Sequence, residues 1–170
     1  MMQLETSRLI LREFQQEDYR ELAPILADPQ VMQFATMGTL LVRQTQARVE
    51  SFMTSYNKFG YGKWATIFKE NGKLVGYCGI VKEQIDDREE IEIGYRFDKS
   101  IWGKGFATEA GLAAIEYGFD RFKFPYILGC VEPENIRSIK VLENLGMRYK
   151  SKTVLKGVNM DIYRLDNSKK

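Results

Sequence analysis

The chain has 170 residues, of which 44% are hydrophobic, and this size and composition predict one ordinary globular domain. Its 25 basic and 23 acidic residues nearly cancel, so the charge balance does not suggest a nucleic-acid-binding protein. There is no histidine and there are two cysteines, which excludes Ser-His-Asp and Cys-His catalytic arrangements and leaves a zinc site without its usual ligands. We therefore expect no metal, and a proton acceptor that is a carboxylate, a tyrosine, a lysine or a bound water.

Two features bear on the compartment of the protein. The longest uncharged run, residues 31–42, contains several polar residues and is too short to span a bilayer. The N-terminus carries no apolar signal segment, so we expect a cytoplasmic protein without membrane or nucleic-acid partners. Cys78 and Cys130 both lie in strand-like runs and are expected to be reduced residues of the core.

The first half of the chain predicts a strand, two helices and a β-hairpin. Apolar residues recur at positions i, i+3, i+4 and i+7 in the second helix, and the hairpin turns at Asn71-Gly72, a strong turn signal. The expected elements are a strand at 8–14, helices at about 17–28 and 43–58, and strands at 64–68 and 74–81.

The second half alternates strands with helices and ends in a strand pair. The mixed-charge stretch 86–89 is expected to be a connection, and Ala107, Ala110, Ala114 and Gly118 form a stripe of small residues that would let the central helix lie close to a sheet. The expected elements are a strand at 91–97, a helix at about 104–121, a strand at 126–131, a helix at 136–145 and strands at 148–155 and 159–165. This order predicts an α/β fold that mixes antiparallel hairpins with one parallel crossover.

Two glycines, Gly103 and Gly105, lie where a predicted strand passes into the central helix. Residues without a Cβ let backbone N–H groups approach a ligand closely, and the first N–H groups of a helix favour phosphate. A plain turn with close helix packing is the alternative reading. The nucleotide-triphosphate pattern GxxxxGK[ST] is absent, and the dinucleotide pattern GxGxxG fails because Thr108 stands at its third glycine.

Three stretches carry a family resemblance. Residues 100–110, SIWGKGFATEA, resemble the pyrophosphate-binding motif [Q/R]xxGx[G/A] of the GCN5-related N-acetyltransferases (GNAT), with Ser100 in place of Gln or Arg. The string WGKGFATEA is similar to the ribosomal-protein N-terminal acetyltransferase (RimJ/RimL-type) subgroup. Residues 135–147, NIRSIKVLENLGM, resemble NxxSxxxLxxLGF with Met147 in place of Phe, and SRLILREF at 7–14 resembles the first strand of the family.

The resemblance covers residues 7–165 and implies a single GNAT domain over 1–170. The implied fold has a mixed central sheet with a splayed parallel strand pair flanked by helices. The implied activity is transfer of the acetyl group of acetyl-CoA to a primary amine by direct attack. The acceptor would be a protein N-terminus, a polyamine or an aminoglycoside-like amine, and the protein would be a monomer or a homodimer. A non-catalytic acyl-CoA sensor with the same fold is the alternative, and a nucleotide-binding domain without acyl chemistry is a third reading.

The resemblance also implies which residues hold the coenzyme. Backbone N–H groups of the glycine turn would bind the pyrophosphate, while the Lys104 side chain either adds charge or stays in solvent. Gly94, in the middle of a strand, indicates a bulge or a close approach of a ligand. Asn135 and Ser138 read either as an N-cap and a first-turn residue or as contacts to the coenzyme arm. The implied coenzyme-binding residues are Ile93, Gly94, Tyr95, Trp102, Gly103, Lys104, Gly105, Phe106, Ala107, Thr108, Asn135 and Ser138.

An amine with a pKa near 10 is only about one part in a thousand neutral at pH 7, so the reaction needs a base. Glu90, Glu92, Gly94 and Arg96 share one strand face, and Glu92 is the expected base because it is nearer the expected position of the thioester carbonyl. A solvated strand face is the alternative reading of these charged residues.

The departing thiolate needs a proton or a low pKa. Many relatives have a tyrosine four residues before the glycine of LGF, where this chain has Leu142. Ser138 or water would therefore protonate the thiolate, or the thiolate would leave unaided. Arg12, Glu17 and the loop 36–41 are the expected lining of the acceptor side.

Overall fold

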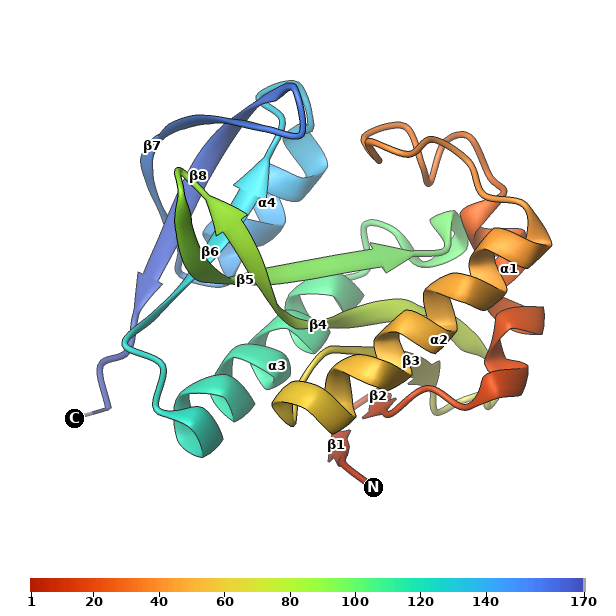
Figure 1. Ribbon diagram of the computed structural model, residues 1–170. Coiled ribbons are helices and arrows are strands. Elements are labelled where there is room, and N and C mark those ends of the chain that lie inside the picture. Colours follow the sequence, from red (N-terminus) through yellow and green to blue (C-terminus); the bar gives the residue numbers. More distant parts are fainter. Residues whose placement is uncertain (170) are drawn as a thin grey trace.

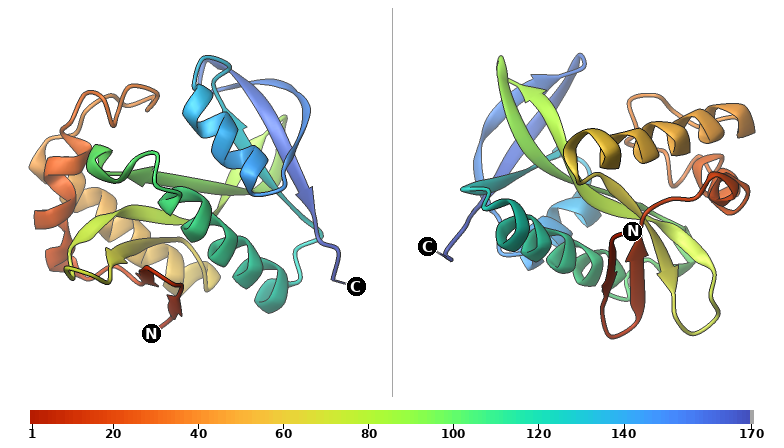
Figure 2. Two further views of the ribbon diagram at one scale, coloured as in Figure 1. Left: turned by 180° about the vertical axis from the view of Figure 1, so that it is seen from behind. Right: turned by 60° about the horizontal axis from the view of Figure 1, so that its bottom comes forward.

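The computed structural model describes residues 1–169 and shows a mixed sheet with helices on both faces (Figures 1 and 2). The strands are β1 (Gln3–Glu5), β2 (Leu9–Arg12), β3 (Lys63–Phe68), β4 (Leu74–Ile85), β5 (Arg88–Phe97), β6 (Tyr126–Val131), β7 (Arg148–Leu155) and β8 (Val158–Asp166). The helices are α1 (Tyr19–Leu26), α2 (Val42–Phe59), α3 (Phe106–Phe122) and α4 (Ile136–Asn144), with short 3-10 helices η1 (Gln16–Asp18) and η2 (Lys99–Ile101).

The eight strands follow the order β1-β2-β3-β4-β5-β6-β8-β7. Every neighbouring pair is antiparallel except β5 and β6, which are parallel. These two strands pair at one position only, Glu92 with Leu128, and then diverge, as Figure 1 shows for the green β5 and the cyan β6. The divergence leaves the second half of β5 without a neighbour on that side, so its backbone is free to bind something else.

Helices α1 and α2 lie on one face of the sheet, and α3 and α4 lie on the other (Figures 1 and 2). Each face has its own hydrophobic cluster, one centred on Leu22, Val49 and Phe52 and the other on Trp64, Ile80 and Ile127. The small residues expected on the central helix let α3 lie close to the sheet, because a Cβ on Gly118 would come within 2.9 Å of Ile80 Cδ1. None of the helices described is long and apolar enough to cross a membrane.

The predicted elements occur in the predicted order, and the short strand β1, which was not predicted, precedes them. The α/β fold with one parallel strand pair is confirmed. The connection expected at 86–89 is present but shorter, because it consists of Asp86 and Asp87 alone. The backbone turns within Asp86 and Asp87, whose φ angles are 50° and 61°, and β5 already begins at Arg88. Aspartate tolerates this left-handed conformation, so a two-residue hairpin turn forms without glycine.

The two cysteines differ in their surroundings. Both are free thiols, as expected, but Cys78 is buried in the core whereas Cys130 on β6 is partly exposed. Burial raises the pKa of the Cys78 thiol to about 12, which keeps this thiol protonated. The core placement expected for both cysteines therefore holds fully only for Cys78.

Candidate active site

Two neighbouring cavities lie where β5 and β6 diverge. The larger has a volume of about 790 Å³ and lies between the end of β5, the glycine turn, α4 and the loop before α2. The smaller has a volume of about 150 Å³ and lies between the middle of β5, the end of β6 and α4. Both cavities are lined by Phe34, Tyr95, Arg96, Asn135 and Ser138. They therefore form one continuous candidate site.

The glycine turn forms the wall of the larger cavity at the start of α3. Gly103 and Gly105 have φ angles of 72° and 80°, and a Cβ on Gly103 would meet nothing within 4 Å. Among the described residues, no backbone N–H from Gly103 to Thr108 donates a hydrogen bond, and the helical ladder begins with Glu109 N–H to Gly105 O. These amides line open space at the positive end of a helix, which is an arrangement suited to binding phosphate.

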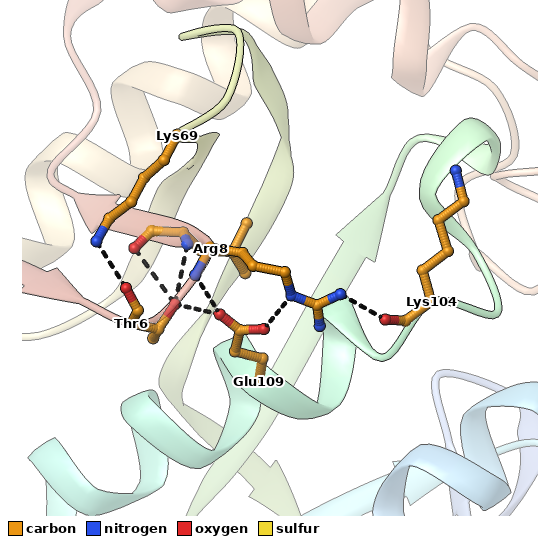
Figure 3. Close-up of polar contacts among 6 residues, drawn as sticks. Thr6, Arg8, Lys69, Lys104 and Glu109 are labelled. Atoms are coloured by element: carbon orange, nitrogen blue, oxygen red, sulfur yellow. Dashed lines mark hydrogen bonds and ion pairs between the residues drawn. The ribbon is translucent and has the colours of Figure 1, made fainter.

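A polar network anchors this turn to the N-terminal strands (Figure 3). The Glu109 carboxylate accepts hydrogen bonds from Thr6 Oγ1 at 2.6 Å, from Arg8 N–H at 2.8 Å and from Arg8 Nε at 2.7 Å. Arg8 also donates from Nη1 to Lys104 O at 2.8 Å, and its guanidinium lies 4.1 Å from the centre of the Phe106 ring. One ion pair thus joins the motif near residue 7 to the glycine turn.

Lys104 does not line either cavity. Its Nζ donates to Ser100 O at 3.0 Å, and Figure 3 shows the side chain directed away from the Arg8–Glu109 pair. A cation on α4 occupies the cavity wall instead, because the Arg137 guanidinium lies 4.5 Å from the centre of the Trp102 ring and both residues line the larger cavity. The geometry therefore favours the interpretation that the Lys104 side chain stays in solvent.

Gly94 has a local reason to lack a side chain. The pairing of β4 with β5 runs without a shift through Gly79 and Gly94, so the bulge, one of the two interpretations of Gly94, is not observed. Lys63, Gly79 and Gly94 form one row across β3, β4 and β5. A Cβ on Gly94 would lie 2.8 Å from Lys63 Cε and 3.0 Å from Lys63 Nζ. The Lys63 side chain therefore lies across the row and places its ammonium group over β5.

Glu92 lies on the same face of β5 as Gly94 and lines the smaller cavity. Burial raises the pKa of Glu92 to about 7, against the opposing effect of the Lys63 charge. Glu90 is buried, with 8% of its surface exposed, and a hydrogen bond with Glu90 raises the pKa of Tyr126. The alternative reading of this strand face as fully solvated is therefore wrong.

Tyr95 lies on the opposite face of β5 and meets α4. Its hydroxyl is 2.8 Å from Ser138 Oγ, and either oxygen can be the donor. Asn135 Oδ1 accepts from Ser138 N–H at 3.3 Å, so Asn135 is the N-cap of α4 and also lines both cavities. Leu142, at the position where many relatives have tyrosine, is 2% exposed. The hydroxyls near this part of the site therefore come from Tyr95 and Ser138.

The residues expected on the acceptor side lie elsewhere. Arg12 forms a two-point ion pair with Asp18, at 2.7 and 2.9 Å, and neither Arg12 nor Glu17 lines either of the two cavities. The loop 36–41 lines neither cavity, whereas Gln30, Val31, Gln33 and Phe34 do. The reason is that Arg96 Nη1 donates to Val31 O at 3.2 Å and holds the earlier part of the loop over β5.

Two further sets of residues that line these cavities were not predicted from the sequence. Arg137, Lys140 and Asn144 line the larger cavity from one side of α4. Their i, i+3, i+7 spacing was a usable signal for a polar helix face. Lys63 lines the smaller cavity, but a single lysine at the start of a strand carries no local signal of its role.

Comparison with known proteins identifies the family. Residues 8–148 match the model of the acetyltransferase (GNAT) domain. The chain is 37% identical over 154 residues to the uncharacterized protein YkkB of Bacillus subtilis, covering 90% of this chain and 88% of that protein. It is 33% identical over 150 residues to the uncharacterized N-acetyltransferase p20 of Bacillus licheniformis, covering 87% and 83% of the two chains.

Solved structures agree with this assignment. An acetyltransferase of the GNAT family from Bacillus anthracis superposes with a TM-score of 0.85 at 25% identity, covering 99% of this chain and 100% of that one. RimL, a ribosomal L7/L12 alpha-N-protein acetyltransferase in complex with coenzyme A, superposes with a TM-score of 0.80 at 16% identity, covering 97% and 98%. The second likeness shows the fold alone. By its domain match, relatives and fold, this chain belongs to the GNAT family and is an acetyl-CoA-dependent N-acetyltransferase.

Proposed function

We propose that this protein transfers the acetyl group of acetyl-CoA directly to a primary amine, which is a protein N-terminus or a small amine. The observation that carries the proposal is the row of unpaired backbone amides from Gly103 to Thr108. These amides open into a cavity of about 790 Å³ that continues to Glu92, Tyr95 and Ser138 through the smaller cavity.

The residues present fit coenzyme A. The unpaired amides offer donors for a pyrophosphate, and Arg137 and Lys140 on α4 add positive charge to the same wall. The unpaired edge of β5 offers main-chain groups to an extended amide-containing arm, in the way that a sheet edge takes an added strand. When bound, acetyl-CoA supplies a thioester carbonyl carbon that is open to attack by an amine.

Glu92 accepts the proton of the attacking amine, directly or through water. Its pKa of about 7 leaves a useful fraction of carboxylate at neutral pH and matches proton transfer near that pH. The amine nitrogen forms a bond to the acetyl carbon, the carbon–sulfur bond breaks, and the electron pair of that bond stays on sulfur. Backbone N–H groups of β5 near Gly94 stabilise the negative charge that develops on the carbonyl oxygen.

Ser138 donates a proton to the departing sulfur and recovers one from water, while the Tyr95 hydroxyl, 2.8 Å away, donates a hydrogen bond to Ser138 Oγ and stabilises the negative charge that develops there. Burial raises the pKa of Tyr95, so this hydroxyl stays protonated and able to donate. Residues 92 and 95 face opposite sides of β5, so the proton acceptor and the proton donor approach the thioester from different sides.

Calorimetric titration with acetyl-CoA, followed by assay of free thiol release across an amine panel, tests the proposal. Gly105→Glu is the matched variant, because a carboxylate there lies on the wall that is proposed to bind phosphate and because φ of 80° strains a side chain. We expect micromolar binding that this variant loses, and acetylation of at least one amine. Binding without turnover of any amine would favour the acyl-CoA sensor, and no binding by the unmodified protein would overturn the proposal.

A further inference from the structure

The smaller cavity carries two cationic side chains on the face of β5 from which the amine would approach. Lys63 and Arg96 both line it. Within the part of the chain that the structure describes, no carboxylate lies within ion-pair distance of Lys63 Nζ, and this nitrogen donates no hydrogen bond to protein. The charge of Glu92 and the Tyr77 ring, whose centre lies 5.4 Å from Nζ, offset part of the cost of this partly buried ammonium group, and a bound anion would offset the rest.

Arg96 also has a side-chain N–H donor without a partner among the described residues. Its Nη1 donates to Val31 O at 3.2 Å, but its Nε is buried and has no partner among the described residues. A guanidinium carries five N–H donors in a planar fork that suits carboxylate and phosphate oxygens. Buried donors without partners are rare in folded proteins, so the free Nε points to a ligand oxygen as its missing acceptor.

The same positive field acts on Tyr77, which is buried beside this cavity. Although burial acts to raise the pKa of Tyr77, the charges of Lys63, Arg96 and Arg48, together with a hydrogen bond from Arg96, outweigh it and hold that pKa below its ordinary value. Two carboxylates, Glu92 and Glu132, line the cavity as well. Glu92 is the proposed base, so its charge is cancelled when it takes the proton of the amine, whereas the cations keep theirs.

We propose that the acceptor is a small amine that also carries an oxyanion, a carboxylate or a phosphate, which Lys63 and Arg96 bind on the Gly94 face of β5. This inference rests on the proposed acetyl transfer and specifies its acceptor. Glu92, Gly94 and Arg96 follow one another on this face at intervals of roughly 7 Å. An amine near Glu92 and an anion between Lys63 and Arg96 are then close enough to belong to one small molecule. A polyamine would bring further positive charge to this face, and a peptide N-terminus would present a neutral amide there.

The test is acceptor specificity measured by thiol release at pH 8.5. This pH lies above the pKa of Glu92, which limits the loss of carboxylate when removal of the Lys63 charge raises that pKa. The panel contains the L-amino acids, their amides, O-phosphoethanolamine, spermidine and a serine-initiated peptide amide. We expect at least one amino acid or the aminoalkyl phosphate to exceed its uncharged counterpart in kcat/KM by tenfold or more. Comparison of the amino acids with O-phosphoethanolamine shows whether the preferred oxyanion is a carboxylate or a phosphate.

Lys63→Met should lower the ratio of kcat/KM for the anionic acceptor to kcat/KM for its amide by roughly tenfold to hundredfold, the usual size of a lost charged hydrogen bond. Lys63→Arg should keep the preference. Lys73→Met is the control, because Lys73 is exposed in the turn between β3 and β4. Faster turnover of spermidine or the peptide, or an acid-to-amide ratio that Lys63→Met does not change, would overturn the inference while acetyl transfer stands. Binding of acetyl-CoA with no turnover of any amine would overturn acetyl transfer itself.

Discussion

Replacing Glu92 by glutamine should make the protein more stable and less active. The structure holds this carboxyl in a partly buried position where burial raises its pKa from the ordinary 4.5 to about 7. Between these two values the folded protein keeps a proton that the unfolded chain releases. The free energy of unfolding therefore falls as the pH rises through this window, and the loss remains at its full size above pH 7.

The size of the effect follows from the two pKa values. A difference from 4.5 to about 7 corresponds to roughly 3 kcal/mol of destabilisation at pH 8 and to less than about 1 kcal/mol at pH 5. Glutamine has nearly the same shape and cannot ionise, so Glu92→Gln should regain most of this free energy at pH 8 and little at pH 5. The same change removes the proposed base and should lower kcat by roughly a hundredfold or more.

Urea unfolding at pH 5 and pH 8, followed by tryptophan fluorescence, measures the stability, and thiol release measures the activity. Glu50→Gln serves as the control, because Glu50 is exposed on α2 and should show no gain that depends on pH. A Glu92→Gln protein that gains no more stability at pH 8 than at pH 5 would refute the raised pKa. The case for Glu92 as the base would then lose its physical support.

Two further changes test how the site is held in place. Glu109→Gln breaks the ion pair with Arg8 at 2.7 Å, so the dissociation constant for acetyl-CoA measured by calorimetry should rise by roughly threefold to tenfold; lost stability with unchanged affinity would mean that the pair only braces the strands. Gly76→Ala should lower the free energy of unfolding by about 3 kcal/mol or more, because φ is 144° and the new Cβ would lie 2.1 Å from Arg96 O. Gly72→Ala, with a φ of 68° and nothing within 4 Å, should cost only about 1 kcal/mol, and an equal loss in both variants would contradict the close approach of the strands.

Features set by nearby residues were predictable from the sequence. The glycine turn, the central helix with its small residues and the Asn135 cap all follow from patterns within about a dozen residues. The connection at Asp86 and Asp87 was predicted, but not its form as a two-residue hairpin turn, because the usual signal, glycine or asparagine, is absent and aspartate takes its place.

Features that depend on contacts between distant segments were not predictable. Lys63 reaches Gly94 only because β3, β4 and β5 align in one register, and no pattern around residue 63 reveals this alignment. The Arg8–Glu109 pair spans a separation of 101 residues, so the string near residue 7 looked like a strand with no link to the glycine turn. The family resemblance placed both strings correctly in order but said nothing about why they belong together.

The absence of a tyrosine at position 142 can be understood from the packing of β6. A Cβ on Gly129 would lie 2.7 Å from Leu142 Cδ2, so the leucine side chain fits into the space that this glycine leaves on β6. A tyrosine ring there would need that space and more, and would have to displace the strand or point elsewhere. Tyr95 provides a hydroxyl from β5 instead, beside Ser138 and on the wall of both cavities. The strand that we propose holds the thioester would thus also supply the phenol, and position 142 is left to pack the core.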